Sequence, residues 1–197
     1  MAILKVLSLM DAVKIEREPQ NGNLRSLLLA FARARIQPIF AQPLPFAMNT
    51  LQIAQELIRR PSVNPLHDPH STGENKVVDW LEEWGHEQKL ETLREPVLNG
   101  RDNISFTITN DQGPHLLLNG HTDTVSVAGM DIEPFNGEVR EGKLWGRGST
   151  DMKGPLACML STLLQLRERD DWKGSVTVGC VVDEETEFQG ILKLIED

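Results

Sequence analysis

The sequence LWGRGSTDMKGP, residues 144–155, places glycines, hydroxyl side chains and one carboxylate, Asp151, directly before a run of apolar residues. Pro155 suits the first turn of a helix. The apolar positions that follow, at 156, 159, 160, 163 and 164, repeat with the spacing of one helix face. We therefore predict a buried helix that begins near Pro155, with Asp151 held in the turn just before it.

Two other stretches carry polar residues at the end of an apolar run. LLLNGHTD leads into His121 and Asp123, and VVDEE leads into Glu184 and Glu185. Both apolar runs have strand length, and ligands of open α/β sheets collect outside the carboxyl ends of the strands. We expect these residues and Asp151 to form one site that is assembled from three separate parts of the chain.

The composition limits the class of protein. The chain has 197 residues, 40% of them hydrophobic, which is enough to bury the core of one ordinary domain. The formal net charge of -9 argues against binding to nucleic acid or to an anionic membrane, which both require clustered Lys and Arg. There is no apolar run of the ~20 residues that a membrane helix needs. We predict a cytoplasmic protein without a nucleic-acid or membrane partner.

Both cysteines and the four histidines other than His121 receive no role in the predicted site. Cys158 and Cys180 each lie in an apolar run and form no CxxC motif, so we predict that both are core residues. His67 and His70 fall in a turn-forming segment and are predicted to be solvated. His115 begins the strand whose other end carries His121, so it is not expected to be a ligand.

The first 47 residues differ from the rest of the sequence. Prolines at 38, 43 and 45 interrupt a basic segment, and a regular pattern begins only at Met48. We interpret residues 1–47 as a poorly ordered N-terminal extension. A mitochondrial-type presequence is the alternative interpretation.

From Met48 onward, helical and strand patterns alternate. This indicates an α/β fold with a mixed, largely parallel sheet and helices on both faces. Because residues 116–118 have no polar face, we expect them to form a central strand that is covered on both sides. Gly85 is predicted to end the second helix. The predicted helices are 51–58, 74–84, 156–164 and 188–195; the predicted strands are 88–93, 103–109, 116–118 and 176–182, with a hairpin at 139–145.

The residue types of the three clusters suit a two-metal site. A carboxylate such as Asp151 can bridge two cations, while His121 gives nitrogen to one and a glutamate gives oxygen to the other. Because neighbouring side chains of extended backbone point in opposite directions, Glu184 or Glu185 can bind metal while the other faces the attacking water. Asp123 is placed to accept the free ring N–H of the histidine and fix its tautomer. This chemistry is hydrolysis of an amide bond.

The three clusters, in this order and with GRGSTDMKG between them, resemble the family of di-zinc amidohydrolases that includes acetylornithine deacetylase, succinyl-diaminopimelate desuccinylase, aminoacylase and carboxypeptidase G. The resemblance covers about residues 48–197 and implies a zinc-exopeptidase-like catalytic domain.

The same resemblance implies a role for each residue of the site. His121 would bind one metal, Asp151 would bridge both and Glu185 would bind the other. Glu184 would be the general base, and Asp123 would orient the histidine. The metals implied are two divalent ions, zinc in the first place, with cobalt or manganese as alternatives.

The family pattern also contains a later acidic ligand, an inserted dimerisation domain and a late histidine, which are not found in this sequence. We therefore interpret residues 48–197 as the N-terminal part of a truncated catalytic domain, inactive by itself and without the family's homodimer contact. The implied substrate is an N-acyl amino acid or a small peptide. The wording of residues 146–154 favours the acetylornithine deacetylase and desuccinylase branch. Aminoacylase and carboxypeptidase or dipeptidase activities remain alternatives, as does a non-catalytic remnant or partner-binding module.

Overall fold

The computed structural model describes residues 48–196. These residues belong to the second of two compact units, Phe46–Asp197. The interpretation of residues 1–47 as an extension lies outside the described residues. Within the described part, no helix has both the length and the apolar character needed to cross a membrane.

The centre of the fold is a four-stranded sheet with the order β1-β2-β6-β3. The pair β3–β6 is parallel, whereas β1–β2 and β2–β6 are antiparallel. The sheet is therefore mixed, as predicted, but the expectation of a largely parallel sheet is wrong for the described strands. The reason is the turn at Gly100, with φ of +71°, which returns β1 directly into β2 as an antiparallel hairpin. The strands are β1 (Glu91–Leu98), β2 (Arg101–Asn110), β3 (His115–His121) and β6 (Gly174–Val181).

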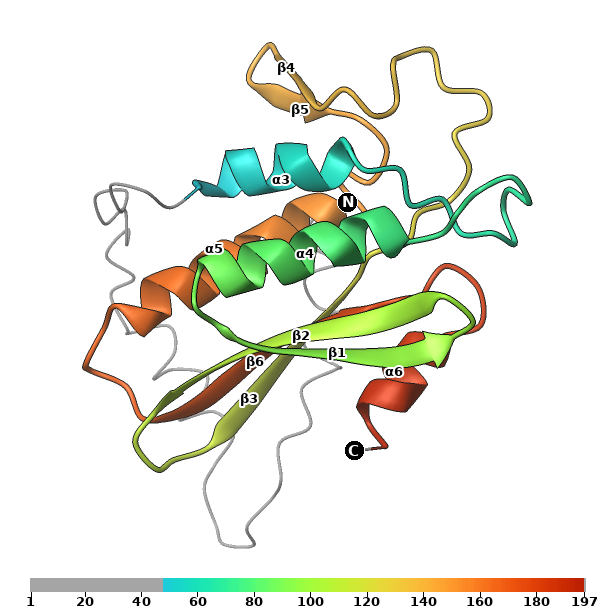
Figure 1. Cartoon of the computed structure of the whole chain (residues 1–197). Helices are drawn as coiled ribbons and strands as arrows, with labels where there is room; N and C mark the ends of the chain where they lie inside the picture. The colour runs from blue at the N-terminus through green and yellow to red at the C-terminus, as the bar shows by residue number, and fades with distance from the viewer. Residues whose placement is uncertain (1–47, 197) are drawn as a thin grey trace, which may run out of the picture. The chain divides into compact units, whose positions relative to one another are not determined.

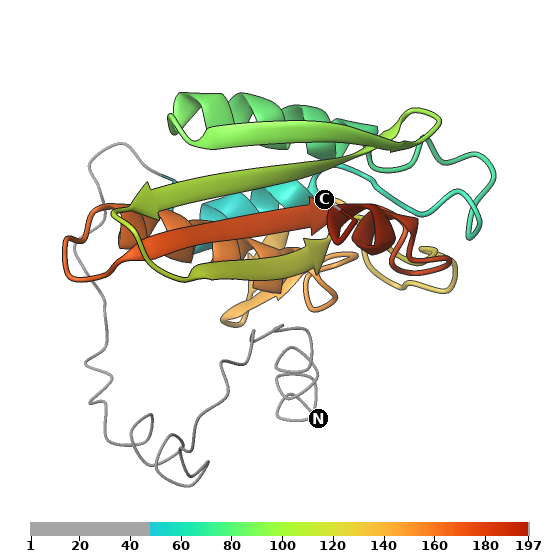
Figure 2. The same ribbon diagram turned by 90° about the horizontal axis from the view of Figure 1, so that it is seen from below.

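Helices cover both faces of the sheet, which confirms the predicted α/β class. Three of them lie on one face and a short one on the other (Figures 1 and 2). The predicted hairpin is also present, and it lies beyond α3 on the side away from the sheet (Figure 1). The three helices on one face are α3 (Thr50–Ile58), α4 (Asn75–Glu87) and α5 (Lys153–Arg167); α6 (Gln189–Leu194) is on the other, and the hairpin is β4 (Glu138–Arg140) with β5 (Lys143–Trp145).

The hydrophobic core lies between the sheet and its three-helix layer. Trp84 of α4 meets Phe106 of β2 edge to face, with ring centroids 5.5 Å apart. Each fully buried Leu, Ile or Phe contributes roughly 1.5–3 kcal/mol to stability. The face of α5 that was predicted from its spacing is buried at Leu156, Met159, Leu160, Leu163 and Leu164.

Gly85 does not end a helix, because α4 continues to Glu87. A β-carbon at this position would lie 2.4 Å from the ring of Phe106 and 2.8 Å from Oγ1 of Thr92. Glycine is therefore needed where α4 makes its close approach to the sheet, and the prediction of a helix end was wrong. A glycine in the sequence can mark either the end of a helix or a place where two elements pack closely, and the sequence alone does not distinguish the two.

β3 is an edge strand of the described sheet rather than the central strand that was predicted. It pairs with β6 on one side only. Leu116 is 39% exposed as a result, and the two leucines after it are half-buried. An apolar run shows that a strand can be covered, but it does not reveal which strands lie beside it.

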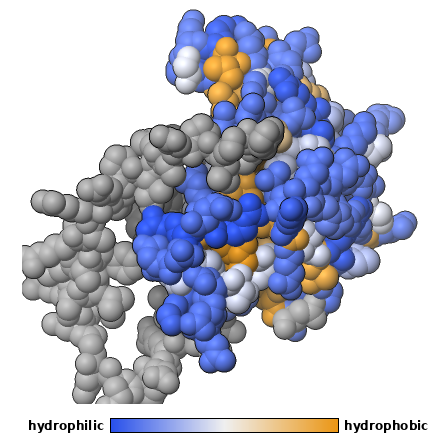
Figure 3. Space-filling view, turned by 60° about the vertical axis from the view of Figure 1, so that its left-hand side comes forward, coloured by the Kyte–Doolittle hydropathy of each residue, from blue (hydrophilic) through white to orange (hydrophobic). Residues whose placement is uncertain are grey.

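On the face shown in Figure 3, hydrophobic areas are small and separated by hydrophilic ones.

The two cysteines occupy different environments. Cys180 is buried in β6, as predicted, whereas Cys158 is exposed on α5 and the prediction for it was wrong. Cys158 follows two buried positions, Leu156 and Ala157, and lies on the solvent side of the helix. Its apolar sequence neighbours belong to the opposite face of α5, because neighbouring residues of a helix point in different directions.

Candidate metal centre

The carboxyl ends of β3 and β6 bring the predicted clusters together. His121, the last residue of β3, pairs in parallel register with Val181, the last residue of β6. The amide of Thr122 donates to the carbonyl of Val181 at 2.8 Å and continues this contact past the strand ends. Parallel pairing therefore places the segment after each strand at the same edge of the sheet.

The imidazole of His121 faces different groups through its two nitrogens. Nδ1 lies 3.2 Å from Oδ1 of Asp123 and 3.0 Å from the main-chain carbonyl of the same residue. Nε2 lies 3.4 Å from Oδ1 of Asp151 and 3.4 Å from Oε2 of Glu184. Nδ1 thus faces the oxygens of Asp123 and Nε2 is directed at the carboxylates of Asp151 and Glu184, which is the orientation of a histidine that binds metal through Nε2.

His121, Glu184 and Glu185 form a group that can hold a metal ion. Each offers one ligand atom, and these atoms lie within 4.8 Å of one another. Together with Asp151, the structure collects the three predicted ligands and the predicted general base. Asp151 and Glu184 have 48% and 41% of their side chains exposed, so the cluster is open to a substrate from solution.

The electrostatics of the cluster favour cations. Burial, together with the nearby carboxylates of Asp151 and Glu184, raises the pKa of Glu185 above its usual value. Burial opposes the charging of His121, but Asp123 and the two glutamates outweigh it and raise the pKa of the imidazole to about 9. The protein thus concentrates negative charge that attracts protons or cations. Imidazole and carboxylate ligands suit zinc and similar divalent ions, so the residues present fit such metals.

Asp123 joins the histidine to the glutamates. It is completely buried, and its two oxygens accept the main-chain N–H groups of Glu184 and Glu185, each at 3.1 Å. Burial opposes its ionisation, but hydrogen bonds from His121 and Asn64 outweigh this effect and lower the pKa of the carboxyl group. Asp123 therefore lies where the sequence predicted an orienting acid, and it also holds the segment that carries the glutamates.

Lys153 fixes the loop that carries Asp151. Its main-chain N–H donates to the carbonyl of Gly148 at 2.8 Å, which closes the loop. Its buried ammonium group donates to the carbonyls of Leu57 and Arg60 at 2.9 and 2.7 Å, where α3 ends. Burial first, and then the positive charge of Arg60, lower the pKa of this ammonium to about 7. The sequence analysis gave no role to Lys153.

His115, His67 and His70 lie as predicted, but His67 also makes a contact near the site. His115 is at the opposite end of β3, with Nε2 2.9 Å from the hydroxyl of Thr177. His67 and His70 are exposed. The ring of His67, however, lies near the site, since its Nε2 is 3.3 Å from the main-chain oxygen of Glu185.

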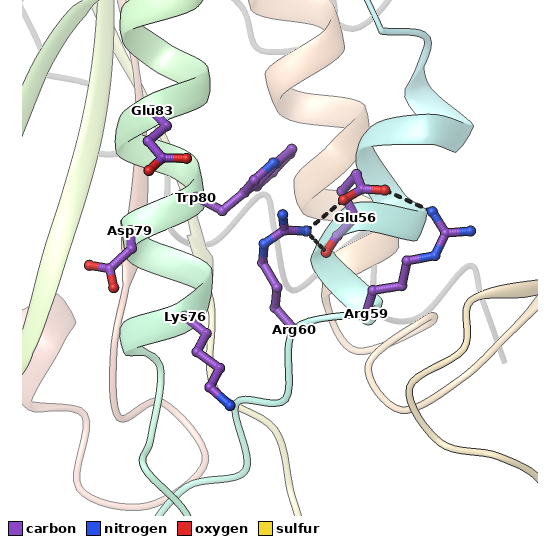
Figure 4. Close-up of a pocket in the computed structure, with 7 residues that line it drawn as sticks. All are labelled: Glu56, Arg59, Arg60, Lys76, Asp79, Trp80 and Glu83. Carbon is purple, nitrogen blue, oxygen red and sulfur yellow. Dashed lines mark hydrogen bonds and ion pairs between the residues drawn. The ribbon is translucent and has the colours of Figure 1, made fainter.

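A charged surface groove lies between α3 and α4, apart from the metal centre (Figure 4). Its arginines already have partners in the protein. Arg59 and Arg60 each contact a carboxylate oxygen of Glu56 at 2.7 Å, and the guanidinium of Arg60 lies 4.8 Å from the ring centre of Trp80. We therefore place no functional site in this groove.

A mixed α/β sheet with a histidine and several carboxylates gathered at its strand ends is an arrangement suited to binding divalent metals. Residues 117–197 match the Peptidase family M20/M25/M40.

Individual proteins are also similar to this chain. The chain is 35% identical over 154 residues to the succinyl-diaminopimelate desuccinylase of Bradyrhizobium sp. (strain ORS 278), covering 75% of this chain and 39% of the relative. It also resembles the M20 family metallo-carboxypeptidase of Sulfolobus solfataricus, with a TM-score of 0.65 and 19% identity, over 76% of this chain and 34% of the other. A dinuclear metal binding peptidase of the M20 family from Bacillus subtilis has a TM-score of 0.54 and 20% identity, over 75% and 38%. The chain thus spans about 39% of the desuccinylase's length.

Proposed function

We propose that this chain supplies part of the active site of a metal-dependent amidohydrolase that cleaves an amide bond in an N-acyl amino acid or a small peptide. The observation that carries the proposal is the arrangement around His121. Its Nε2 faces Asp151 and Glu184 at 3.4 Å, while Nδ1 is held by buried Asp123. The similarity to desuccinylases favours an N-succinyl or related N-acyl amino acid as substrate.

Each residue has a distinct role in the proposal. His121, Asp151 and Glu185 would hold two divalent metals, zinc in the first place, with Asp151 between them. When bound, the metals would polarise the amide carbonyl and lower the pKa of the attacking water. The carboxylate of Glu184 takes a proton from that water and passes it to the nitrogen of the leaving amine. Asp123 keeps the histidine in the required tautomer.

Three direct ligands are few for two metals, because a catalytic zinc usually has three protein ligands of its own. We therefore propose that further ligands come from outside the described residues 48–196. We expect the 197-residue chain to bind zinc weakly and to show no hydrolysis of N-acyl amino acids above background. Zinc titration by calorimetry, combined with an assay on N-succinyl and N-acetyl amino acids, measures both properties. Tight binding of two zinc ions with turnover would contradict this part of the proposal.

The roles of the acidic residues are separated by comparing variants. Asp151→Asn should remove most of the zinc binding, whereas Glu184→Gln should leave it nearly unchanged. In a longer chain that carries the remaining ligands, Glu184→Gln should lower kcat by a factor of at least ~100, because a general base is lost. Glu187→Gln is the matched control, since Glu187 is an exposed acid of the same segment. Loss of zinc in Glu184→Gln with retention in Glu185→Gln would reverse the two glutamate roles. A longer chain that binds zinc but hydrolyses no substrate would favour a non-catalytic binding module.

A further inference from the structure

Asn64 is a buried amide beside the metal centre that the proposed function does not use. Its main-chain N–H donates to the carbonyl of Thr124 at 2.9 Å, and Val63 forms a parallel bridge with Thr124. These contacts fix Asn64 next to Asp123. The side chain of Asn64 has no exposed surface.

The orientation of the Asn64 amide follows from its neighbours. Oδ1 accepts the main-chain N–H of Leu66 at 3.1 Å, so the NH₂ group must point the other way. There, Nδ2 lies 2.8 Å from Oδ2 of Asp123 and 3.1 Å from Oδ1 of Asp183. The hydroxyl of Thr186, also 3.1 Å from Nδ2, donates to Asp183 itself. The two hydrogens of Nδ2 can therefore serve the two buried carboxylates.

Asp183 forms the turn between β6 and the glutamates. Its φ of +67° is unusual for a residue with a side chain, and it bends the chain toward the metal centre. Arg101 contacts its carboxylate at 3.0 Å and holds Glu74 through two hydrogen bonds of 2.7 Å. Glu74 in turn accepts the main-chain N–H of Asp183 at 3.2 Å. Both the side chain and the main chain of the turn are thus anchored to α4 and β2.

We propose that Asn64 and Arg101 are positioning residues of the metal centre. They hold the turn at Asp183 so that the N–H groups of Glu184 and Glu185 stay on the carboxylate of Asp123. The effect of these two residues on metal binding rests on the proposed function, whereas their effect on the turn at Asp183 does not. The neutral amide of Asn64 is suited to this place because its NH₂ group donates to the carboxylates of both Asp123 and Asp183. Without this shared donor, the two negative charges would repel each other with nothing between them.

Exchange of the Glu184 and Glu185 amide hydrogens tests the inference without metal. NMR of the metal-free 197-residue chain compares these two amides with those in the β2–β6 ladder, such as Val178. In Asn64→Asp, which keeps the shape but replaces the donor with an acceptor, exchange of the two glutamate amides should be at least ~10-fold faster relative to the ladder. Asn64→Ser, a milder change, should give a smaller acceleration at the same two positions.

Two matched controls separate positioning from general loss of stability. Asn110 lies at the opposite end of β2 and donates to the carbonyl of Trp172 at 2.7 Å, so Asn110→Asp should leave the relative exchange of the glutamate amides unchanged. Arg94 joins three carboxylates at 2.8–2.9 Å away from the turn. Arg101→Lys should accelerate exchange at both glutamates, whereas Arg94→Lys should not, because lysine cannot reproduce a forked contact.

Zinc titration of the same variants gives the second readout. Asn64→Asp and Arg101→Lys should lower zinc affinity by about 10-fold, and the two controls should not. Equal acceleration at the glutamate and ladder amides would overturn the inference, because the residues would then stabilise the fold in general. If exchange responds as expected while even a longer chain that carries the remaining ligands binds no zinc, the proposed function fails and the positioning of the turn stands. If Asn64→Asp does not fold, Asn64→Ser and Arg101→Lys decide the outcome.

Discussion

The two ends of the β3–β6 pair are held together in different ways. At the carboxyl end, buried ionisable side chains add to the main-chain bond from Thr122 to Val181, and Asp123 accepts hydrogen bonds from His121 and from two main-chain amides. At the opposite end the main chain makes them directly. Ser175 donates to the carbonyl of Pro114 at 3.1 Å, and a β-carbon on Gly174 would lie 2.1 Å from that same oxygen.

This difference separates chemistry from stability. Main-chain packing around a glycine contains no titratable side chain and no metal ligand, so it can only stabilise the fold. A buried carboxylate in contact with a histidine can take part in chemistry, but it needs all its hydrogen bonds. Removing one of its partners therefore lowers the stability of the fold more than removing a partner of an exposed group. We therefore expect substitutions at the carboxyl end to affect both stability and metal binding, and those at the opposite end to affect stability alone.

The largest effect is expected for Asp123→Leu. The change removes the carboxylate that accepts hydrogen bonds from His121, Asn64 and two main-chain amides, so the free energy of unfolding should fall by about 3–5 kcal/mol. Urea unfolding followed by circular dichroism measures it. Asp171→Leu, which removes only an exposed pair with Arg169, should stay within about 1 kcal/mol of the wild type. Similar losses of unfolding free energy in the two variants would show that the buried hydrogen bonds of Asp123 contribute no more to stability than an exposed ion pair.

The next effect concerns the two histidines of β3. His121→Ala should lower zinc affinity by at least ~100-fold, because a direct nitrogen ligand is lost. His115→Ala, at the opposite end of the same strand, should leave zinc affinity unchanged and remove only the contact with Thr177. Calorimetric titration of both variants under one buffer measures the ratio. A zinc site that survives His121→Ala would place the metal elsewhere and remove the basis of the comparison.

A smaller effect is expected for Gly174→Ala. Its φ of +114° and the approach of Pro114 leave no room for a methyl group, so the free energy of unfolding should fall by about 2–3 kcal/mol. Zinc affinity should remain that of the wild type. In Gly142→Ala, where φ is +71° and nothing lies within 4 Å, only backbone strain of about 1 kcal/mol should appear. A change in zinc affinity for Gly174→Ala would mean that the two ends are coupled through the strands.

Local patterns in the sequence predicted most elements of the fold but not their neighbours. The spacing of apolar residues revealed α3 and α5. In the structure α3 begins directly after Asn49, whose side chain accepts the main-chain N–H of Gln52. The pairing of β2 with β6 and the edge position of β3 depend on residues 60 or more positions apart. Nothing in either strand's own sequence encodes that choice, so the direction of the sheet and the exposure of Leu116 were mispredicted.

The site was predictable where its residues stand at the ends of apolar runs. His121, Asp151, Glu184 and Glu185 all have such positions, and the structure brings them together. Asn64 does not, because it lies in a proline-containing segment that reads as an ordinary turn. The signal that was present, an asparagine enclosed between apolar and proline residues, acquires meaning only when the loop is seen packed against Asp123.

The residue that follows Asn64 protects it from chemical ageing. Deamidation of an asparagine begins when the main-chain nitrogen of the next residue attacks the side-chain carbonyl, and Pro65 has no N–H with which to do so. Asn99 and Asn136, which are both exposed and are each followed by a glycine, lack this protection, since glycine has an N–H and no side chain to hinder the attack. Peptide mass spectrometry of stored protein should therefore find aspartate at Asn99 and Asn136 long before it appears at Asn64. The donor between the two buried carboxylates is thus chemically durable as well as sterically enclosed.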